Sequence, residues 1–222
     1  MLQSSTIKFL KDLKKNNNKE WFDANRKVYE NAKADYAAFI DGIIKAHGKK
    51  DAGIANLTAK DCLFRINRDI RFSKDKSPYK TNFGASINFG GKKIMRGGYY
   101  IHCEPGASFV AGGIYMPMPD DLKKLRQEVD YCFDEFKKII SSKNFKSVYG
   151  ELYAGDDMKL SRPPKGYDEN NPAIEFIKLK SFIATAKIAD ADLTSGEFSK
   201  KVLNAFAAVQ PLVAFVNRAM EN

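Results

Sequence analysis

Apolar residues recur at helical spacing near both ends of the chain. Close to the beginning, four apolar residues between 7 and 13 predict a short helix, and ten between Trp21 and Ile44 predict a long one. A polar run separates the two stripes, and Asn16 or Asn18 is expected to cap the second helix. That helix is expected to end near His47-Gly48, because glycine suits the end of a helix.

A two-residue alternation replaces the helical spacing in the middle of the chain, which is typical of strands that bury one face. The alternation predicts strands at 63–72, 83–89, 99–104 and 107–115. Turns are expected between the later strands, at the Gly-Gly-Lys-Lys run and at Pro105-Gly106. Four successive short strands with turns between them predict an antiparallel meander.

Helical spacing returns in an apolar stripe over 119–140. The next expected elements are a loop at 161–172, a short helix at 173–180 and a further strand at 182–188. Thr194 and Glu197 have the spacing of a capping box before a final helix, which Pro211 is expected to kink or split.

These patterns predict an α+β fold, in which an antiparallel β-meander of four or more strands packs with N-terminal and C-terminal helices. A parallel sheet of alternating strands and helices is excluded, because that alternation is missing. The chain is expected to form a single domain over 1–222. Its parts are helical 1–50, the sheet 62–116, and 119–222, which is helical with one extra strand.

The net charge of +10 is unevenly distributed along the 222 residues. Residues 1–100 hold 21 Lys and Arg against 10 Asp and Glu, whereas residues 101–222 hold 16 against 17. A basic half of this kind attracts nucleic acid, phosphorylated metabolites or acidic proteins. Lysine-rich solvated surfaces produce the same bias without any specific partner.

Cysteine usage and hydropathy favour a cytoplasmic protein. Cys62, Cys103 and Cys132 are far apart and form no CxxC pair, so they are expected to be core residues rather than a disulfide framework or a zinc site. No long apolar run is free of charges, so neither a transmembrane helix nor an association with membranes is expected. Lys8 and Lys11 interrupt the first residues, where a signal peptide requires an apolar stretch.

The most charged stretch is "RINRDIRFSKDKSPYKTN", residues 65–82, with three Arg, three Lys and two Asp. On a strand, its first part would place Arg, Asn, Asp and Arg on one face, followed by a Lys-rich loop. Arg side chains bind phosphate and carboxylate with two parallel hydrogen bonds. The residues expected to bind an anionic ligand are Arg65, Asn67, Arg68, Arg71, Lys76, Tyr79 and Lys80.

Arg68 does not fit the strand pattern, since its parity places it on the apolar face. Either a bulge lifts it out of that face, or its side chain is buried and pairs with a carboxylate of a packed helix. The alternative for the whole stretch is a solvated strand stabilised by cross-strand ion pairs, which needs no ligand.

A second chemically suggestive stretch is "YYIHCEP", in which Tyr100, His102 and Glu104 share one face of a predicted strand. Histidine is the usual group for proton transfer near neutral pH. If the meander brings this face beside Asp69, then Asp69, His102 and Glu104 are the candidate catalytic residues. The alternative is a structural histidine that is hydrogen-bonded on the sheet and has no catalytic role. A metal site would need a further ligand that the pattern does not supply, so none is predicted.

Known phosphate-binding and nucleophile motifs are missing. There is no GxxxxGK[ST] loop, no GxGxxG before a helix and no GxSxG. The SxxK match at Ser73 stands without the partner motifs that give it meaning. The sequence does not identify a cofactor or an oligomeric state.

Five segments together resemble an uncharacterised family catalogued as domain of unknown function 2461 (DUF2461). They are "FLKDLKKNNNKEWFDANRKVYE", "RINRDIRFSKDKSPYKTNFG", "YYIHCEPGASFVAGGIYMP", "PPKGYDENNPAIEFIKLKSF" and "VLNAFAAVQPLVAFVN". The resemblance implies one intracellular domain and carries over no activity and no catalytic residue. In this family a His often precedes the Pro of the fourth segment, and this chain has Asn171 there.

Three functions follow from these observations. The first is binding of an anionic, phosphate- or carboxylate-bearing small molecule, with hydrolytic or transfer chemistry on it. The second is sequence-independent nucleic-acid binding by the basic half. The third is a structural Arg/Asp network that ties the meander to the helices in a protein-interaction domain.

Overall fold

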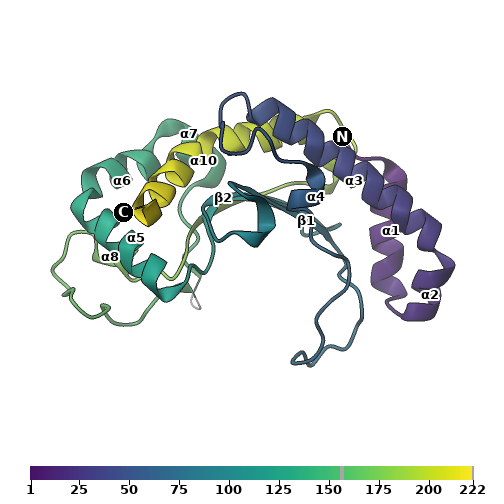
Figure 1. Ribbon diagram of the computed structural model, residues 1–222, viewed down its shortest axis with the longest axis horizontal. Helices are drawn as coiled ribbons and strands as arrows, with labels where there is room; N and C mark the ends of the chain where they lie inside the picture. The colour runs from purple at the N-terminus through teal and green to yellow at the C-terminus, as the bar shows by residue number, and fades with distance from the viewer. Residues whose placement is uncertain (156–157, 222) are drawn as a thin grey trace. The chain divides into compact units, whose positions relative to one another are not determined.

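The computed structural model describes residues 1–155 and 158–221 (Figure 1). Contacts divide the chain into two compact units, each made of three segments. The first unit comprises Met1–Ile94, Tyr100–Val110 and Lys187–Leu203, and the second comprises Met95–Tyr99, Ala111–Ala186 and Asn204–Asn222. The single domain expected from the sequence stays a prediction.

The strands form one four-stranded antiparallel sheet in the order β1-β2-β3-β4. They are β1 (Phe83–Asn88), β2 (Gly98–Cys103), β3 (Phe109–Ile114) and β4 (Phe182–Lys187). The predicted α+β class is confirmed, and so are the predicted strands at 83–89, 99–104, 107–115 and 182–188, to within a few residues at their ends.

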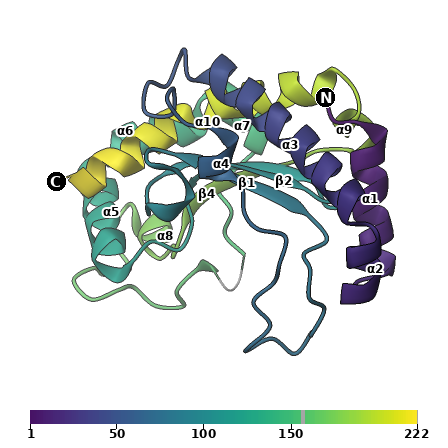
Figure 2. The same cartoon turned by 45° about the vertical axis from the view of Figure 1, so that its right-hand side comes forward.

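The strand predicted at 63–72 is wrong. The segment forms only isolated bridges, Leu63 with Ala85 and Asn67 with Tyr79, and otherwise folds back on itself as a long loop between α4 and β1 (Figure 2). Alternation misled the prediction because its apolar positions do not share a buried face. Ile66 is buried, but Phe72 is 95 % exposed. Residues 65–80 are called the basic arm below.

Arg68 is neither lifted by a bulge nor paired with a helix. Its guanidinium forms an ion pair with Asp75 of the same arm and donates a hydrogen bond to Ser73 Oγ at 3.3 Å. Because the segment is not a strand, the parity argument for Arg68 does not apply.

The first unit packs helices against β1 and β2. Its elements are α1 (Ser4–Lys15), α2 (Lys19–Ala24), α3 (Arg26–His47), α4 (Ala59–Cys62), the 3-10 turn η1 (Gly91–Lys93), α9 (Asp190–Leu193) and the beginning of α10 (Glu197–Glu221). Helices α1 and α3 lie side by side (Figure 1). The ring of Tyr36 in α3 packs on Phe83, and its hydroxyl donates to the Ile101 carbonyl at 3.0 Å. Aromatic packing therefore fixes these helices to one face of the sheet.

The long helix predicted after the polar run is two helices. Asn18 caps α2 as expected, since its side chain accepts a hydrogen bond from the Trp21 N–H at 2.9 Å. The chain then leaves helical geometry at Asn25, with φ −105° and ψ 17°, and α3 continues to His47. The apolar stripe continued through Asn25, so periodicity alone could not show the break.

The second unit holds α5 (Pro119–Tyr131), α6 (Phe133–Ser141), α7 (Lys143–Tyr149), α8 (Ile174–Ile177) and the rest of α10. The single helix predicted over 119–140 is interrupted at Cys132, where φ is −109° and ψ is 35°. The predicted capping box is also wrong, because Thr194 ends α9 and Ser195 Oγ accepts from the Glu197 N–H.

Helix α10 continues through Pro211 and is not split there. A proline inside a helix costs about 3 kcal/mol. Val209, Leu212 and Phe215 around it are buried, and each buried side chain of this kind contributes about 1.5–3 kcal/mol. Packing therefore outweighs the cost of the proline.

Among the described residues, α10 alone is long and apolar enough, by length and composition, to cross a membrane. Of its most apolar window, 56 % is buried inside the protein, which is typical of a core helix. The three cysteines are free thiols, and Cys62 and Cys103 are buried as expected.

Candidate functional site

Strand β2 presents different residues to its two faces. Ile101 and Cys103 are fully buried on the face that α3 covers. Tyr100 and His102 lie on the opposite face and are half-buried, and Glu104 directly after the strand joins them. The predicted shared face of these three side chains is therefore present.

The two ring nitrogens of His102 have different partners. Nε2 lies 3.1 Å from Glu104 Oε2, and Nδ1 lies 3.1 Å from Tyr100 Oη. Asn82 Nδ2 lies 3.4 Å from the same Nδ1, and Thr81 Oγ1 donates to Glu104 Oε1 at 2.9 Å. These five residues, Thr81, Asn82, Tyr100, His102 and Glu104, are called the His102 cluster.

The partners of His102 define where its proton lies. An amide Nδ2 can only donate, so Nδ1 of His102 accepts from Asn82 and from the Tyr100 hydroxyl. Nε2 then carries the proton and donates it to the Glu104 carboxylate. The cluster is thus a hydroxyl–imidazole–carboxylate chain, the order that lets a histidine accept a proton from a hydroxyl group.

Aromatic packing holds the imidazole and the phenol in place. The Phe109 ring stacks on His102 with 4.7 Å between centroids and 16° between planes. Tyr100 packs against the same ring at 5.7 Å. On the neighbouring strand β1, Gly84 lies under the phenol, and a Cβ there would be only 2.6 Å from Tyr100 Oη. A residue larger than glycine at this position would displace the hydroxyl.

Burial and hydrogen bonding set the ionisation of the cluster. Burial acts to raise the pKa of Glu104, but hydrogen bonds from His102 and Thr81 and the charge of Lys14 outweigh it, so this pKa lies below its usual range. Burial, with the nearby charge of Glu104, raises the pKa of Tyr100 to about 12. Near neutral pH, Glu104 is therefore an anion and Tyr100 is a neutral hydroxyl.

Two cations lie near the cluster, and a third lies beside one of them. Lys14 Nζ of α1 is 3.7 Å from Glu104 Oε1. Lys80 Nζ lies 5.4 Å from the centre of the Phe64 ring, and that ring is 6.3 Å from Tyr100. Burial and the positive charge of Arg65 lower the pKa of Lys80. Arg65 and Lys80 are thus close enough to repel each other, and both were predicted ligand-binding residues.

Both carboxylates of the basic arm pair with arginines of the arm itself. Asp69 accepts two hydrogen bonds from Arg71, at 3.0 and 2.7 Å, and these bonds lower the pKa of Asp69. Lys76 Nζ donates to the Ile70 carbonyl at 3.0 Å. Among the residues that the structure describes, no hydrogen bond or ion pair joins Asp69 to the His102 cluster. The predicted catalytic set is thus brought together only for His102 and Glu104.

Asn67 and Tyr79, also predicted to bind a ligand, hold the base of the arm instead. Their backbones form the isolated bridge. The Tyr79 ring is buried and stacks on Phe22 with 3.9 Å between centroids. The Asn17 side chain donates to the Tyr79 carbonyl at 2.9 Å and accepts from its N–H at 3.1 Å.

Sequence reasoning missed four residues around the cluster: Lys14, Thr81, Asn82 and Phe109. Thr81 and Asn82 immediately precede a predicted strand, so the pairing of that strand with the next could have placed them beside His102. Lys14 had no such signal, because it comes from a helix far away in the sequence.

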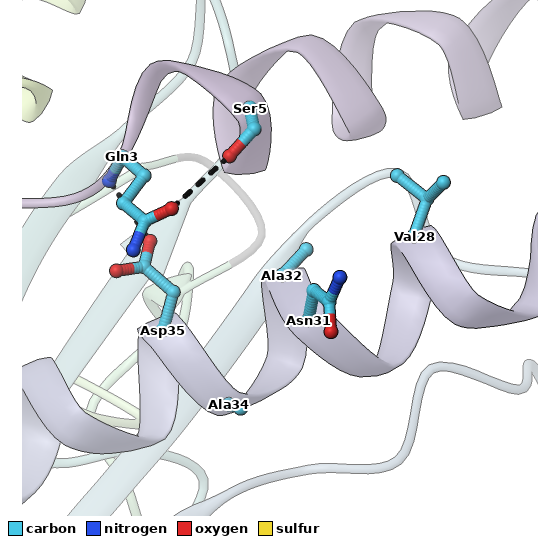
Figure 3. A pocket seen from close by; sticks show the side chains of 7 residues that line it. All are labelled: Gln3, Ser5, Val28, Asn31, Ala32, Ala34 and Asp35. Atoms are coloured by element: carbon cyan, nitrogen blue, oxygen red, sulfur yellow. Dashed lines mark hydrogen bonds between the residues drawn. The ribbon is translucent and has the colours of Figure 1, made fainter.

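No group of three or more His, Cys, Asp or Glu side chains that could hold a metal ion occurs in the part of the chain that the structure describes. A separate groove of about 360 Å³ lies between α1 and α3, lined by Gln3, Ser5, Val28, Asn31, Ala32, Ala34 and Asp35 (Figure 3). The carboxylate of Asp35 in this groove already accepts hydrogen bonds from the Gln3 N–H at 2.9 Å and from Thr6 Oγ1 at 2.6 Å. Asp35 therefore serves to hold the start of α1.

A family model described as "Conserved hypothetical protein (DUF2461)" matches residues 5–215 of the chain. Comparisons with curated proteins and with solved structures give no match. The matched region includes the basic arm and the His102 cluster. The side chain of Asn171 donates to Asp130 Oδ1 at 2.7 Å.

Proposed function

Since the chain belongs to this family of conserved hypothetical proteins, whose description assigns no activity, we propose a function from the geometry of the site. The chain binds an anionic, phosphate- or carboxylate-bearing small molecule beside the His102 cluster. Tyr100, His102 and Glu104 move a proton in hydrolytic or transfer chemistry on that molecule.

The observation that carries this proposal is the hydrogen bonding of His102 to a hydroxyl on one side and a carboxylate on the other. Tyr100 Oη takes a proton from a hydroxyl group or water of the substrate while its own proton passes to Nδ1 of His102. The resulting imidazolium is stabilised by Glu104 through the Nε2–H bond. The substrate oxygen that has lost its proton attacks the phosphoryl or carboxyl centre, and the bond to the leaving oxygen breaks. The imidazolium returns the proton through Tyr100 to that leaving oxygen, so Tyr100, His102 and Glu104 all end as they began.

The cations favour an anionic ligand. Within residues 1–155 and 158–221, neither Arg65 nor Lys80 forms an ion pair with a carboxylate, and the two repel each other. A phosphate or carboxylate between them would relieve that repulsion and gain two charge-assisted hydrogen bonds. Lys14 would remain with Glu104 and preserve the ionised carboxylate.

The binding step can be tested by titrating inorganic phosphate against the two histidines in an NMR experiment. A phosphate bound near His102 should shift the ring proton resonances of His102, because a nearby anion changes the electrostatic environment of the imidazole. His47, buried in α3, is the internal control and should not respond. Lys80→Gln should weaken the response several-fold, whereas Lys93→Gln, at an exposed position of η1, should not. Equal responses of both histidines at constant ionic strength would exclude the site.

The chemical step can be tested with p-nitrophenyl phosphate and p-nitrophenyl acetate as probes of the two ligand classes. Turnover should fall by roughly 100-fold or more in Tyr100→Phe and in His102→Gln, the effect of removing one proton-transfer group. Turnover unchanged by both substitutions would show that the cluster does not perform the reaction.

We also propose a cytoplasmic location, since Cys62, Cys103 and Cys132 are free thiols, as expected in a reducing compartment. Thiol labelling of the unfolded protein, isolated under alkylating conditions, should find all three reduced.

A further inference from the structure

The tip of the basic arm presents an aromatic ring to solvent. Phe72 has 95 % of its surface exposed, the largest exposed fraction among the large apolar side chains that the structure describes. The guanidinium of Arg71 lies 5.7 Å from the centre of the Phe72 ring. Both faces of this ring are therefore open to a planar partner that stacks on it.

The arm is braced, so the tip has a defined shape. Backbone hydrogen bonds cross it from Arg68 N–H to the Pro78 carbonyl at 2.9 Å and from Lys80 N–H to the Ile66 carbonyl at 2.8 Å. The Arg68–Asp75 ion pair crosses it again, closer to the tip. A braced backbone loses less conformational entropy when the tip binds a partner.

Positive charge surrounds the exposed ring. The arm carries Arg65, Arg68, Arg71, Lys74, Lys76 and Lys80 against Asp69 and Asp75, which gives a net charge of +4. Both carboxylates are already engaged, by Arg71 and by Arg68. Lys74 and Lys76 flank the tip and are exposed.

We propose that the tip of the arm binds single-stranded nucleic acid. Phe72 stacks on an unpaired base, and Lys74 and Lys76 neutralise neighbouring phosphates. Combining an aromatic ring with a positively charged surface is how proteins hold single strands without reading their sequence. A duplex hides the faces of its bases, so it cannot use Phe72. A membrane surface fits less well, because the tip offers one large exposed apolar side chain rather than several.

The proposal can be tested by fluorescence anisotropy of the full chain with labelled dT20 and rU20, and with a 20-base-pair duplex, at several salt concentrations. Phe72→Ala should weaken binding of the single strands by about 5- to 150-fold, the effect of losing one stacked base, and should leave the salt dependence unchanged. Lys74→Ala combined with Lys76→Ala should reduce the slope of log K against log salt by about 1.4, since each phosphate contact contributes about 0.7.

Matched variants separate these effects from general charge and surface changes. Tyr131→Ala removes an exposed ring from α5 in the less basic half, and Lys137→Ala with Lys138→Ala removes two exposed lysines from α6. Both should bind like the original chain. Because Phe72, Lys74 and Lys76 are exposed, unfolding curves should confirm that their variants remain folded.

Three results would overturn the proposal. The first is no binding of dT20 or rU20 at low salt. The second is an affinity that Phe72→Ala leaves unchanged. The third is Phe72-dependent binding to vesicles of anionic lipid without binding to either single strand, which would assign the tip to a membrane surface. The residues tested are not members of the His102 cluster, so failure here would leave the proposed acid–base site standing.

Discussion

The His102 cluster and the tip of the basic arm use similar residue types in opposite ways. In the cluster, Glu104 and His102 are half-buried, and Thr81, Asn82 and Lys14 contact them from distant parts of the chain. At the tip, Asp69 pairs with Arg71 two residues away, and both side chains are largely in solvent. One region is held by the tertiary fold and the other by its own sequence.

This difference separates chemistry from recognition. A half-buried carboxylate and phenol have shifted pKa values because burial and fixed partners act on them, and groups perturbed in this way are candidates for a functional site. Exposed ion pairs contribute little to stability, so they can be rearranged when a ligand arrives. The dense charge of the arm is therefore less informative about catalysis than a single histidine with two partners.

The largest expected effect comes from detaching the arm from the fold. Tyr79→Ala should reduce the free energy of unfolding by about 3–5 kcal/mol, because it removes a buried ring stacked on Phe22. Phe72→Ala, the matched aromatic deletion at the tip, should change it by less than about 0.5 kcal/mol. Urea unfolding of the two variants measures both values, and similar losses would show that the tip is not independent of the core.

The stability of the fold at alkaline pH should depend on the buried phenol of Tyr100. The pKa of Tyr100 is raised to about 12, so the neutral phenol favours the folded state at neutral pH. That contribution, about 2–3 kcal/mol, is complete below the ordinary tyrosine pKa and is lost as the pH rises from about 10 to 12. The Tyr100→Phe variant has no phenol to ionise, so the difference in the free energy of unfolding between it and the original chain should shrink over this pH range. Tyr131→Phe, at an exposed ring, should match the original throughout.

The stability of the fold at acidic pH should depend on the carboxylate of Glu104. The pKa of Glu104 lies below its usual range, so its stabilising contribution is complete above that range and is lost as the pH falls through the folded-state pKa. Glu104→Gln should cost about 1–2 kcal/mol at pH 7, from the loss of charge-assisted hydrogen bonds, and less at pH 3. Thermal unfolding at the two pH values measures this. A cost independent of pH would mean that the charge of Glu104 is unimportant.

The smallest effect is expected from the matched change at the tip. Asp69→Asn removes an ion pair between exposed side chains, so the urea midpoint should not change measurably. In the oligonucleotide experiment, the same substitution should strengthen binding slightly, because it leaves Arg71 free to contact a phosphate. A clear loss of stability would mean that the tip is held as tightly as the cluster.

Much of the sheet was predictable from the sequence. Strand β2 buries every second residue under helices, and this burial produces the alternation of apolar and polar residues from Tyr99 to Glu104. The arm was mistaken for a strand because Phe64 and Phe72 alternate with charges without being buried. Breaks at Asn25 and Cys132 left the apolar stripes intact, so periodicity could not detect them.

For the site, strand parity predicted the neighbours His102 and Glu104 correctly. It could not bring in Lys14, whose position depends on how α1 packs in three dimensions. Strand parity also predicted Asp69 beside His102 and Glu104. In the structure, the Asp69 carboxylate instead accepts hydrogen bonds from Arg71.

The Asn17 side chain acts towards Tyr79 as a neighbouring strand would, since it both donates to the carbonyl and accepts from the N–H. This pairing determines the order in which the backbone amides of the arm exchange with solvent. Exchange of the Tyr79 amide with solvent requires the turn between α1 and α2 to move away, whereas amides nearer Phe72 need only the arm to open. Hydrogen exchange should therefore progress from the tip towards the base, and its slowest step should depend on the helices rather than on the arm.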